Sequence, residues 1–333
     1  MGDIMQMNRE YSLDFFRQHI FSEDYIIITS NSENMRSQKL LLEFPDAKYI
    51  DIIYSVSPNK SGTLDDSFMV TTSFKCTFNG NCYCSLYQDL QSFVSQINNE
   101  SKKLIIDISG FHLRFLGAFL AIISDNEWDS VICAYTEPTA YPRTEDVTPV
   151  GISDGEKGKF SGGFDLNSSF WGYDEIPNLK TITSERGNYI WIAFLGFEGK
   201  RSSAVYTEIS DDSSTTIPVI TIPAIRPGWA NYAFEANQVL FENAKISSAD
   251  IKYTDALDPY AAYNFIESIS SKYPKRHLVI SPLGTRPVSL GVLLYALKHE
   301  ESEIYFDTPK ESCSKIVSSG KIHIYDMLSF FNS

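Results

Sequence analysis

The sequence is poor in cationic side chains. It holds 28 Lys and Arg against 42 Asp and Glu, which gives a formal net charge of -14. Surfaces that bind nucleic acids generally carry clustered Lys and Arg. The acidic balance therefore argues against general nucleic-acid binding, although one small anion in a locally basic cleft is compatible with it.

Long apolar runs and a secretory leader are also absent. No stretch reaches the roughly 20 apolar residues that a transmembrane helix needs. The first residues, MGDIMQMNREYS, lack the basic and apolar regions of a signal peptide. Because the cysteine count is odd, at 5, and no export signal is seen, we expect a cytoplasmic protein without membrane contact.

Metal-binding and nucleotide-binding motifs are missing as well. Cys76, Cys82 and Cys84 lie in FKCTFNGNCYC, but their spacing is not a zinc pattern and no His is near. The Asn-Gly pair between them predicts a hairpin turn instead, and Cys133 in SVICAY is expected in the core. Since neither GxGxxG nor GxxxxGK[ST] occurs, we expect no metal and no cofactor.

What the sequence does contain is an alternation of strand-like and helix-like runs. With 333 residues and 43% hydrophobic side chains, the chain is long enough for two domains. The alternation predicts an α/β fold with mostly parallel sheets. The runs that read as strands are 24–30, 47–55, 102–109, 129–135, 187–196, 215–223, 248–255, 276–281 and 302–309; those that read as helices are 35–44, 85–99, 114–124, 200–209, 228–244, 258–273 and 289–300.

Several landmarks occur twice in the same order. Glu33 and Arg36 follow one apolar strand, as Glu198 and Arg201 follow another. The octets GFHLRFLG, from Gly110, and GTRPVSLG, from Gly284, both open and close on Gly and lead into an apolar helix. The offset stays near about 170 residues, so we interpret the chain as an internal duplication of a Rossmann-like unit. Two unrelated α/β units are the alternative.

This interpretation divides the chain into two tandem Rossmann-like repeats. The first repeat spans 1–141 and contains a β-hairpin insertion at about 55–86. A polar, Gly-rich linker spans 142–188, and the second repeat spans 189–333. Whether the two repeats share one sheet stays open.

The candidate binding site lies in the loops that follow the strands. Ligands of open parallel sheets bind at the carboxyl ends of the strands, where helix N-termini favour anions. Four such loops each carry an Arg. The candidate ligand-binding residues are Glu33, Arg36, Gly110, His112, Arg114, Glu198, Lys200, Arg201, Arg226, Gly284, Thr285 and Arg286. Alternatively, the glycines only allow tight turns, and the arginines pair with Glu33 and Glu198.

One residue of these loops is a candidate for catalysis. His112 has the side chain used most often as a general acid or base, and its counterpart in the second octet is Arg286. Ser109 and Ser281 end their strands and are weak candidate nucleophiles without an assigned base. Asp107 lies in an apolar strand, where a hydrogen-bonded structural role or the orientation of a loop is expected.

The duplicated unit and the strand, Gly-loop, helix arrangement resemble the tandem CARF-like, or SAVED-type, Rossmann sensors of prokaryotic antiviral systems. The resemblance covers about residues 25–140 and 189–325. It implies that a cyclic oligonucleotide binds across the strand ends of two Rossmann-like units. Such sensors are usually fused to an effector, for which we expect no room in this sequence. The resemblance then implies either a separate partner subunit or an enzyme that consumes the signal. The implied contacts match Arg36, Gly110 to Arg114, Arg201 and Gly284 to Arg286.

Three functions remain open from the sequence. The first is a sensor or binding module for a nucleotide-type anionic ligand, acting through an effector protein in antiviral defence. The second is a nucleotide-processing enzyme that uses the same cleft, with His112 as acid or base. The third is a non-enzymatic structural subunit of a multiprotein complex.

Overall fold

The computed structural model describes residues 10–30, 34–58, 64–72, 84–141, 170–174, 188–211, 213–309 and 318–331. The chain forms two compact units. The first unit comprises Met1–Ala140, Ile176–Asn178 and Ile316–Ser333, and the second comprises Tyr141–Glu175 and Leu179–Lys315. Each unit is built around its own main sheet.

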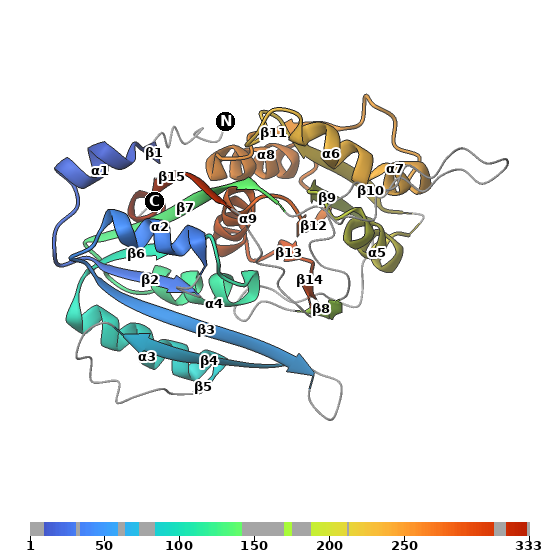
Figure 1. The fold of residues 1–333 in the computed structure, drawn as a ribbon. Helices are drawn as coiled ribbons and strands as arrows, with labels where there is room; N and C mark the ends of the chain where they lie inside the picture. The colour runs from blue at the N-terminus through green and yellow to red at the C-terminus, as the bar shows by residue number, and fades with distance from the viewer. Residues whose placement is uncertain are drawn as a thin grey trace. The chain divides into compact units, whose positions relative to one another are not determined.

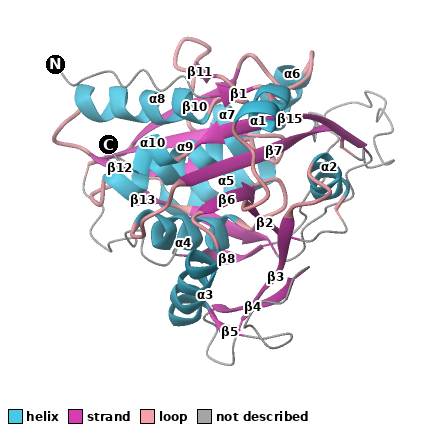
Figure 2. Cartoon of the chain, turned by 90° about the vertical axis from the view of Figure 1, so that its left-hand side faces the viewer, coloured by secondary structure: helices cyan, strands magenta, loops and turns pink. Residues whose placement is uncertain are grey.

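The first unit contains a mixed, eight-stranded sheet. Its strands, in spatial order, are β1 (Glu10–Tyr11), β15 (Ser318–Asp326), β7 (Ser130–Ala140), β6 (Lys103–Asp107), β2 (Ile26–Ser30), β3 (Lys48–Pro58), β4 (Leu64–Thr72) and β5 (Cys84–Ser85). The central strands β7, β6, β2 and β3 are parallel, whereas the strands at both edges are antiparallel. Figure 2 shows these strands following one another through the sheet. β3 and β4 form a long ribbon (Figure 1).

Helices cover both faces of this sheet. They are α1 (Leu13–His19), α2 (Met35–Glu43), α3 (Leu86–Glu100), α4 (Leu113–Ser124) and the short α10 (Leu328–Phe331). Phe16 of α1 and Leu40 of α2 pack with Ile27 and Ile105, which are buried on one face. On the other face, aromatic rings of α3 and α4 pack against Phe68 of β4. Every residue of β2 is buried because both faces are covered.

The second unit contains a five-stranded sheet that is parallel throughout. Its strands, in spatial order, are β11 (Lys252–Thr254), β10 (Thr215–Thr221), β9 (Tyr189–Leu195), β12 (His277–Pro282) and β13 (Glu303–Ile304). A small antiparallel sheet pairs β8 (Phe170–Asp174) with β14 (Phe306–Pro309). The helices are α5 (Gly199–Ile209), α6 (Trp229–Ala236), α7 (Gln238–Asn243), α8 (Pro259–Lys272) and α9 (Arg286–Lys298).

The two main sheets share a strand order. In the first sheet four parallel strands run β3, β2, β6, β7, and in the second they run β10, β9, β12, β13. In each case the earliest of the four strands lies inside the sheet, and the chain continues first to one side of it and later to the other. The loops after β2 and β6, and after β9 and β12, therefore diverge at a switch point, where ligands bind in open α/β sheets.

The predicted α/β class with mostly parallel sheets is confirmed, but some elements differ from expectation. The expected helix over 228–244 is two helices, α6 and α7, joined at Asn237. The expected strand over 302–309 is β13 followed by β14, which pair with different strands. β3 pairs antiparallel with β4, whereas the Asn-Gly turn of the predicted hairpin insertion, at 79–80, lies outside the described residues.

The largest difference concerns the end of the chain. The second repeat was expected to run to residue 333, yet β15 pairs antiparallel with β7 of the first sheet. β15 thereby pairs with the main-chain N–H and C=O groups on the edge of β7 that faces away from β6. Of the expected linker 142–188, only 170–174 and 188 are described, and 170–174 forms β8.

The described residues provide findings on the cysteines, on metal binding and on membrane-spanning helices. Cys133 is fully buried in β7, and burial raises the pKa of its thiol. Cys76 and Cys82 lie outside the described residues. Within the described ranges, no cluster of His, Cys, Asp and Glu is suited to a metal ion, and no helix is both long and apolar enough to span a bilayer.

Candidate functional site

Asp107 organises the switch point of the first sheet. It ends β6 and is fully buried. Its Oδ2 accepts a hydrogen bond from Thr29 Oγ1 at 3.1 Å, and its Oδ1 accepts one from the Ser109 backbone N–H at 3.0 Å. The carboxylate therefore fastens the loop after β6 to the neighbouring strand β2, which agrees with the structural role expected from the sequence.

Ser109 extends this network to β7 and α2. Its Oγ accepts a hydrogen bond from the Thr136 backbone N–H at 2.9 Å, and Thr136 Oγ1 donates to the Arg36 carbonyl oxygen at 3.2 Å. Ser109 is almost completely buried. Its hydroxyl thus serves as a link between strand ends, and the first turn of α2 is held against β7.

Gly110 brings the loop after β6 into direct contact with the end of β2. A Cβ atom at this position would lie 2.5 Å from the Ser30 carbonyl oxygen, which is too close for any side chain. The same Cβ position is 3.8 Å from Ser37 Oγ. The glycine therefore permits the close approach that gathers the end of β2, the start of α2 and the loop after β6.

Arg36 and Ser37 lie in the first turn of α2 with unsatisfied polar atoms. Asn34 begins the helix by accepting a hydrogen bond from the Arg36 backbone N–H at 3.0 Å. Arg36 is 8% exposed and Ser37 is 0% exposed, yet among the described residues the buried Arg36 Nε and Ser37 Oγ have no hydrogen-bond partner. A buried polar atom left unpaired costs about 1–3 kcal/mol. Glu33, the expected partner of Arg36, lies outside the described residues.

His112 lies two residues beyond Gly110 and packs against an aromatic ring. It occupies the N-cap position of α4, and its ring centroid is 5.1 Å from that of Tyr54 on β3. Both side chains are half-buried. Arg114, another predicted site residue, is buried in the first turn of the same helix. The first unit thus places a partly exposed aromatic pair next to the loop that carries Gly110.

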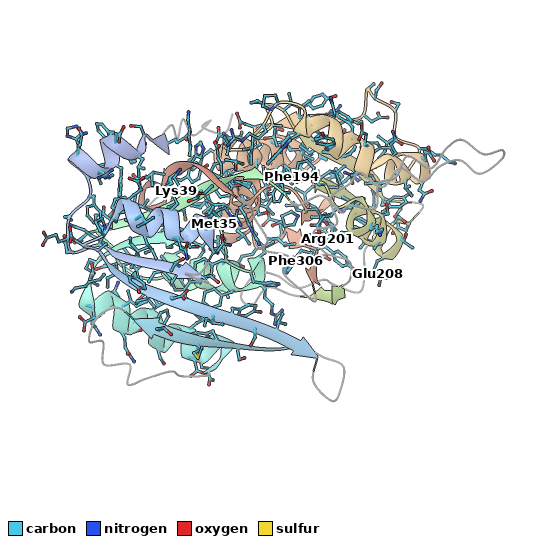
Figure 3. All side chains as sticks on the ribbon, viewed as in Figure 1. Met35, Lys39, Phe194, Arg201, Glu208 and Phe306 are labelled. Carbon is cyan, nitrogen blue, oxygen red and sulfur yellow. The ribbon has the colours of Figure 1, made fainter. Side chains whose placement is uncertain are left out.

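At the corresponding place in the second unit, the Arg is paired. Arg201, in the first turn of α5, forms an ion pair with Glu198, and the side chains are 14% and 12% exposed. Figure 3 labels Arg201 and Glu208 on α5, and Met35 and Lys39 on α2. This pairing is the structural alternative that the sequence left open for Arg201. Lys200, the neighbouring predicted site residue, is exposed.

Ser202, which follows Arg201, also has internal partners. Its Oγ lies within hydrogen-bond distance of two acceptors, the Gly199 carbonyl oxygen at 3.0 Å and Asn237 Oδ1 at 2.5 Å, and donates its single proton to one of them. Asn237 in turn donates from Nδ2 to the Gly196 carbonyl oxygen at 2.9 Å. Sequence reasoning missed Asn237 because it lies inside a run that reads as one continuous helix. Its role depends on contacts with residues that are distant from it in the sequence.

The loop after β12 is tied down in a similar way to the loop after β6. Thr285 caps α9 at its N-terminus, and its Oγ1 donates to the Ala256 carbonyl oxygen at 2.6 Å. Ser281 Oγ accepts from Trp191 Nε1 at 2.9 Å and donates to the Tyr305 carbonyl oxygen at 2.7 Å. Like Ser109, Ser281 therefore links the ends of neighbouring strands.

The remaining predicted residues of the second unit lie in two different loops. Gly284 and Arg286 flank Thr285 and are half-buried, and Arg226 is half-buried in the loop after β10. A Cβ on Gly284 would make only ordinary contact, 3.6 Å from the Phe194 carbonyl oxygen. The loop after β9 instead approaches the loop after β12 closely at Gly196, whose Cβ would lie 2.5 Å from the Leu283 carbonyl oxygen, and Gly199 at the start of α5 allows a still closer approach to the Ala236 carbonyl oxygen.

An aromatic cluster also lies at this end of the second sheet. The ring centroid of Trp229, at the start of α6, is 5.5 Å from that of Phe197 and 5.3 Å from that of Tyr141. Phe197 follows β9 and Trp229 follows β10, so both rings occupy loops at the carboxyl ends of strands. Phe197 and Tyr141 were not among the predicted site residues.

Comparisons with known proteins add no relative to this description. No protein-family model matches the chain, and no curated protein matches it either. The two switch points differ in their geometry. The first brings Arg36, Ser37 and Gly110 together with unsatisfied polar atoms, whereas the second brings Arg201 and Glu198 together as an ion pair.

Proposed function

We propose that the first unit binds a phosphate-bearing, nucleotide-type ligand at the switch point of its sheet. The observation that carries this proposal lies in the first turn of α2. There the buried atoms Arg36 Nε and Ser37 Oγ have no hydrogen-bond partner within the part of the chain that the structure describes. A ligand that supplied acceptors to both atoms would remove their desolvation penalty. Ligand binding is therefore favoured by the free energy that the two unpaired atoms cost the free protein.

The chemistry of these two groups selects an anion. A guanidinium forms short, charge-assisted hydrogen bonds to phosphate oxygens, and a hydroxyl can donate one more. Both groups lie at the N-terminal end of a nine-residue helix, where the helix dipole stabilises negative charge. The net charge of -14 repels anions from the rest of the surface, so binding is confined to such a locally cationic place.

The half-buried aromatic pair supports a nucleotide over a simple phosphate. Tyr54 and His112 are half-buried and lie beside the Gly110 loop, and in this proposal a base stacks on this ring pair in a sequence-tolerant way. Stacking on an aromatic face contributes about 1–3 kcal/mol per base. A ligand with both phosphate and base would use the Arg36 and Ser37 atoms together with this ring pair.

We further infer that the protein is a sensor or binding module that acts through a partner protein. The shared order of four parallel strands supports an internal duplication of a Rossmann-like unit, as in the tandem CARF-like sensors that the sequence resembles. A cytoplasmic role in antiviral defence rests on that resemblance. In this proposal the bound nucleotide is a signal, and an effector protein reads its presence.

The proposal can be tested by ligand-dependent thermal unfolding of the full chain. Mono-, di- and cyclic oligonucleotides are screened against the wild type, Arg36→Ala and Ser37→Ala. A ligand that binds only the folded state raises Tm with its concentration. Because a hydrogen bond to a charged group contributes about 1.5–3 kcal/mol, Arg36→Ala should weaken binding roughly 10- to 150-fold. Ser37→Ala should weaken it less.

Arg17→Ala provides the matched control. Arg17 lies on α1 of the same unit and pairs with Glu43, the last residue of α2, at 2.9 Å. This variant removes the same charge from the other end of the helix and should bind as the wild type does. Unchanged affinity in Arg36→Ala, or no shift of Tm with any compound, would overturn the proposal.

Chromatography of the ligand recovered after incubation separates a sensor from an enzyme. A sensor leaves the ligand intact. An enzyme converts the ligand, and His112→Ala would abolish that conversion.

A further inference from the structure

The strand β15 pairs irregularly with β7 near its start. Ser319 lies opposite Pro138 and Ile322 lies opposite Thr136, with a register shift between these two pairs. The chain advances three residues along β15 but only two along β7 over this distance, so β15 carries one extra residue there. Such a bulge disrupts the hydrogen-bond ladder locally, and its main-chain groups need partners from elsewhere.

Lys39 of α2 provides a partner within this bulge. Its Nζ donates a hydrogen bond to the carbonyl oxygen of Gly320, and both residues are half-buried. Figure 3 labels Lys39 on α2, which packs against β15 and β7. The side chain of Lys39 therefore ties the helix directly to the irregular start of β15.

The helix that holds the bulge is also the helix of the proposed binding site. Arg36 and Ser37 lie in its first turn, and Lys39 follows within the same helix. The Arg36 carbonyl oxygen accepts a hydrogen bond from Thr136 Oγ1 at 3.2 Å, and Thr136 lies opposite Ile322 at the end of the bulge. The first turn of α2 is thus connected to β15 through Lys39 and also through β7.

We propose that ligand binding at the first turn of α2 is coupled to the docking of the start of β15 onto β7. This inference rests on the proposed function, in which the ligand supplies acceptors to Arg36 and Ser37. A ligand that fixes this turn also fixes Lys39 against Gly320, and it thereby opposes local opening of the bulge. The ligand shifts the opening equilibrium by the difference between its affinities for the closed and the open form.

The position of β15 in the chain gives this coupling a regulatory meaning. β14 belongs to the second unit, and β15 is the next strand along the chain and belongs to the first. A ligand at α2 therefore changes the stability of the segment at which the chain returns to the first unit. In this proposal α2 receives the signal, and β15 is the element whose opening reports that the site is occupied.

Hydrogen exchange of the full chain tests the coupling, with and without saturating inorganic pyrophosphate. In the wild type, the amides of residues 319–322 should exchange at least about fivefold more slowly when pyrophosphate is bound, which is the low end of typical coupling between sites. Lys39→Met should still bind pyrophosphate in calorimetry but should lose this gain in protection, because the link between α2 and the bulge is removed. Lys39→Arg keeps a donor on a long side chain and should recover part of the gain.

Arg17→Met is the matched control. Arg17 ties the other end of α2 to α1 through Glu43, at 2.9 Å. This variant also replaces a cation that holds α2 by an apolar side chain, but it leaves the contact with β15 intact. It should keep both the affinity for pyrophosphate and the gain in protection. Far-UV circular dichroism and thermal unfolding check that each variant is folded.

The outcomes separate this inference from the proposed function. If pyrophosphate binds the wild type and not Arg36→Ala, but residues 319–322 gain no protection or gain it equally in Lys39→Met, the coupling is wrong and the proposed function stands. Loss of binding in Lys39→Met would make Lys39 a ligand contact and would also overturn the coupling. Equal binding to the wild type and Arg36→Ala would overturn both. If pyrophosphate does not bind the wild type, the coupling is overturned and the nucleotide screen decides the proposed function.

Discussion

The same dipeptide, Arg-Ser, begins a helix at the switch point of each sheet, and the two copies differ in their surroundings. Arg201 and Ser202 are satisfied within the chain, whereas the buried Arg36 Nε and Ser37 Oγ have no hydrogen-bond partner among the residues that the structure describes. The comparison shows that residue type and position in a fold do not fix a binding site. The groups nearby decide whether a cation is available to a ligand or already neutralised.

The sheets around these two positions differ in a related way. The second sheet is parallel throughout, and Asn237 at the junction of α6 and α7 reaches back to the loop after β9. The first sheet is parallel only in its centre, and its loop after β6 is fixed by Asp107, Ser109 and Thr136. In both units these hydrogen bonds hold the loops of the switch point in place. Among the described residues, only those of the second unit also provide acceptors to the side chains of the Arg-Ser pair.

The largest expected effect is on stability, and it comes from replacing Arg201 by Met, an apolar side chain of similar length. The same replacement at Arg36 serves as the comparison. Arg201→Met removes the cation paired with the poorly exposed Glu198, which should cost about 3 kcal/mol of unfolding free energy. Arg36→Met should be neutral or stabilising, because it removes a buried group with an unsatisfied Nε. Urea unfolding measures both changes.

Adding Glu198→Gln to Arg201→Met should restore most of the lost stability, because no buried carboxylate is then left without its cation. An equal loss in Arg36→Met and Arg201→Met would contradict the comparison. Such a result would mean that the Arg36 guanidinium has stabilising interactions as strong as those of the ion pair.

A smaller effect is expected at the glycines that form the two switch points. Gly110→Ala and Gly196→Ala each place a Cβ 2.5 Å from a carbonyl oxygen, and overpacking of this kind costs about 1–3 kcal/mol. Gly284→Ala meets only ordinary contacts and should change stability by less than about 0.5 kcal/mol. Thermal unfolding compares the three variants. If Gly284→Ala proved as costly as the others, the assignment of the close approach to Gly110 and Gly196 would fail.

The smallest effect is a pH dependence confined to the first unit. His323 of β15 bonds Glu10 through Nδ1 at 2.6 Å and Glu137 through Nε2 at 2.7 Å. Burial by itself lowers the pKa of His323, but the hydrogen bonds and charges of Glu10 and Glu137 outweigh burial and raise it above 6.5. The stabilisation from this contact is therefore fully present below pH about 6.5 and is lost as pH rises through the raised pKa.

Hydrogen exchange at several pH values locates this effect. Amides of β15 and β7 should lose protection as pH increases beyond that range, after correction for intrinsic exchange, while those of β9 and β12 should not. In His323→Gln the difference between the two sheets should no longer depend on pH. A pH dependence that persisted in His323→Gln would assign the effect to other groups.

The local elements were predictable because their signals are local. The apolar run of β2 and the helical spacing before Glu43 can be read from about ten residues each, and both were predicted near their observed places. Asp107 was also predicted in the strand that corresponds to β6, and Gly110 in the loop that follows it. A buried strand end followed by Gly is a signal contained within a few neighbouring residues.

What the tertiary structure decided depends on groups that are distant in sequence. The pairing of β15 with β7 joins residues such as Ile324 and Ala134, and no local periodicity specifies that partner. The sequence alone determined the central strands of both sheets, most of the helices and the positions of Arg36 and Arg201. Hydrophobic periodicity and helix starts are properties of consecutive residues. Only the tertiary structure decided which pair is satisfied, because a hydrogen bond requires a partner within about 3 Å. Asn237 meets that condition through folding alone.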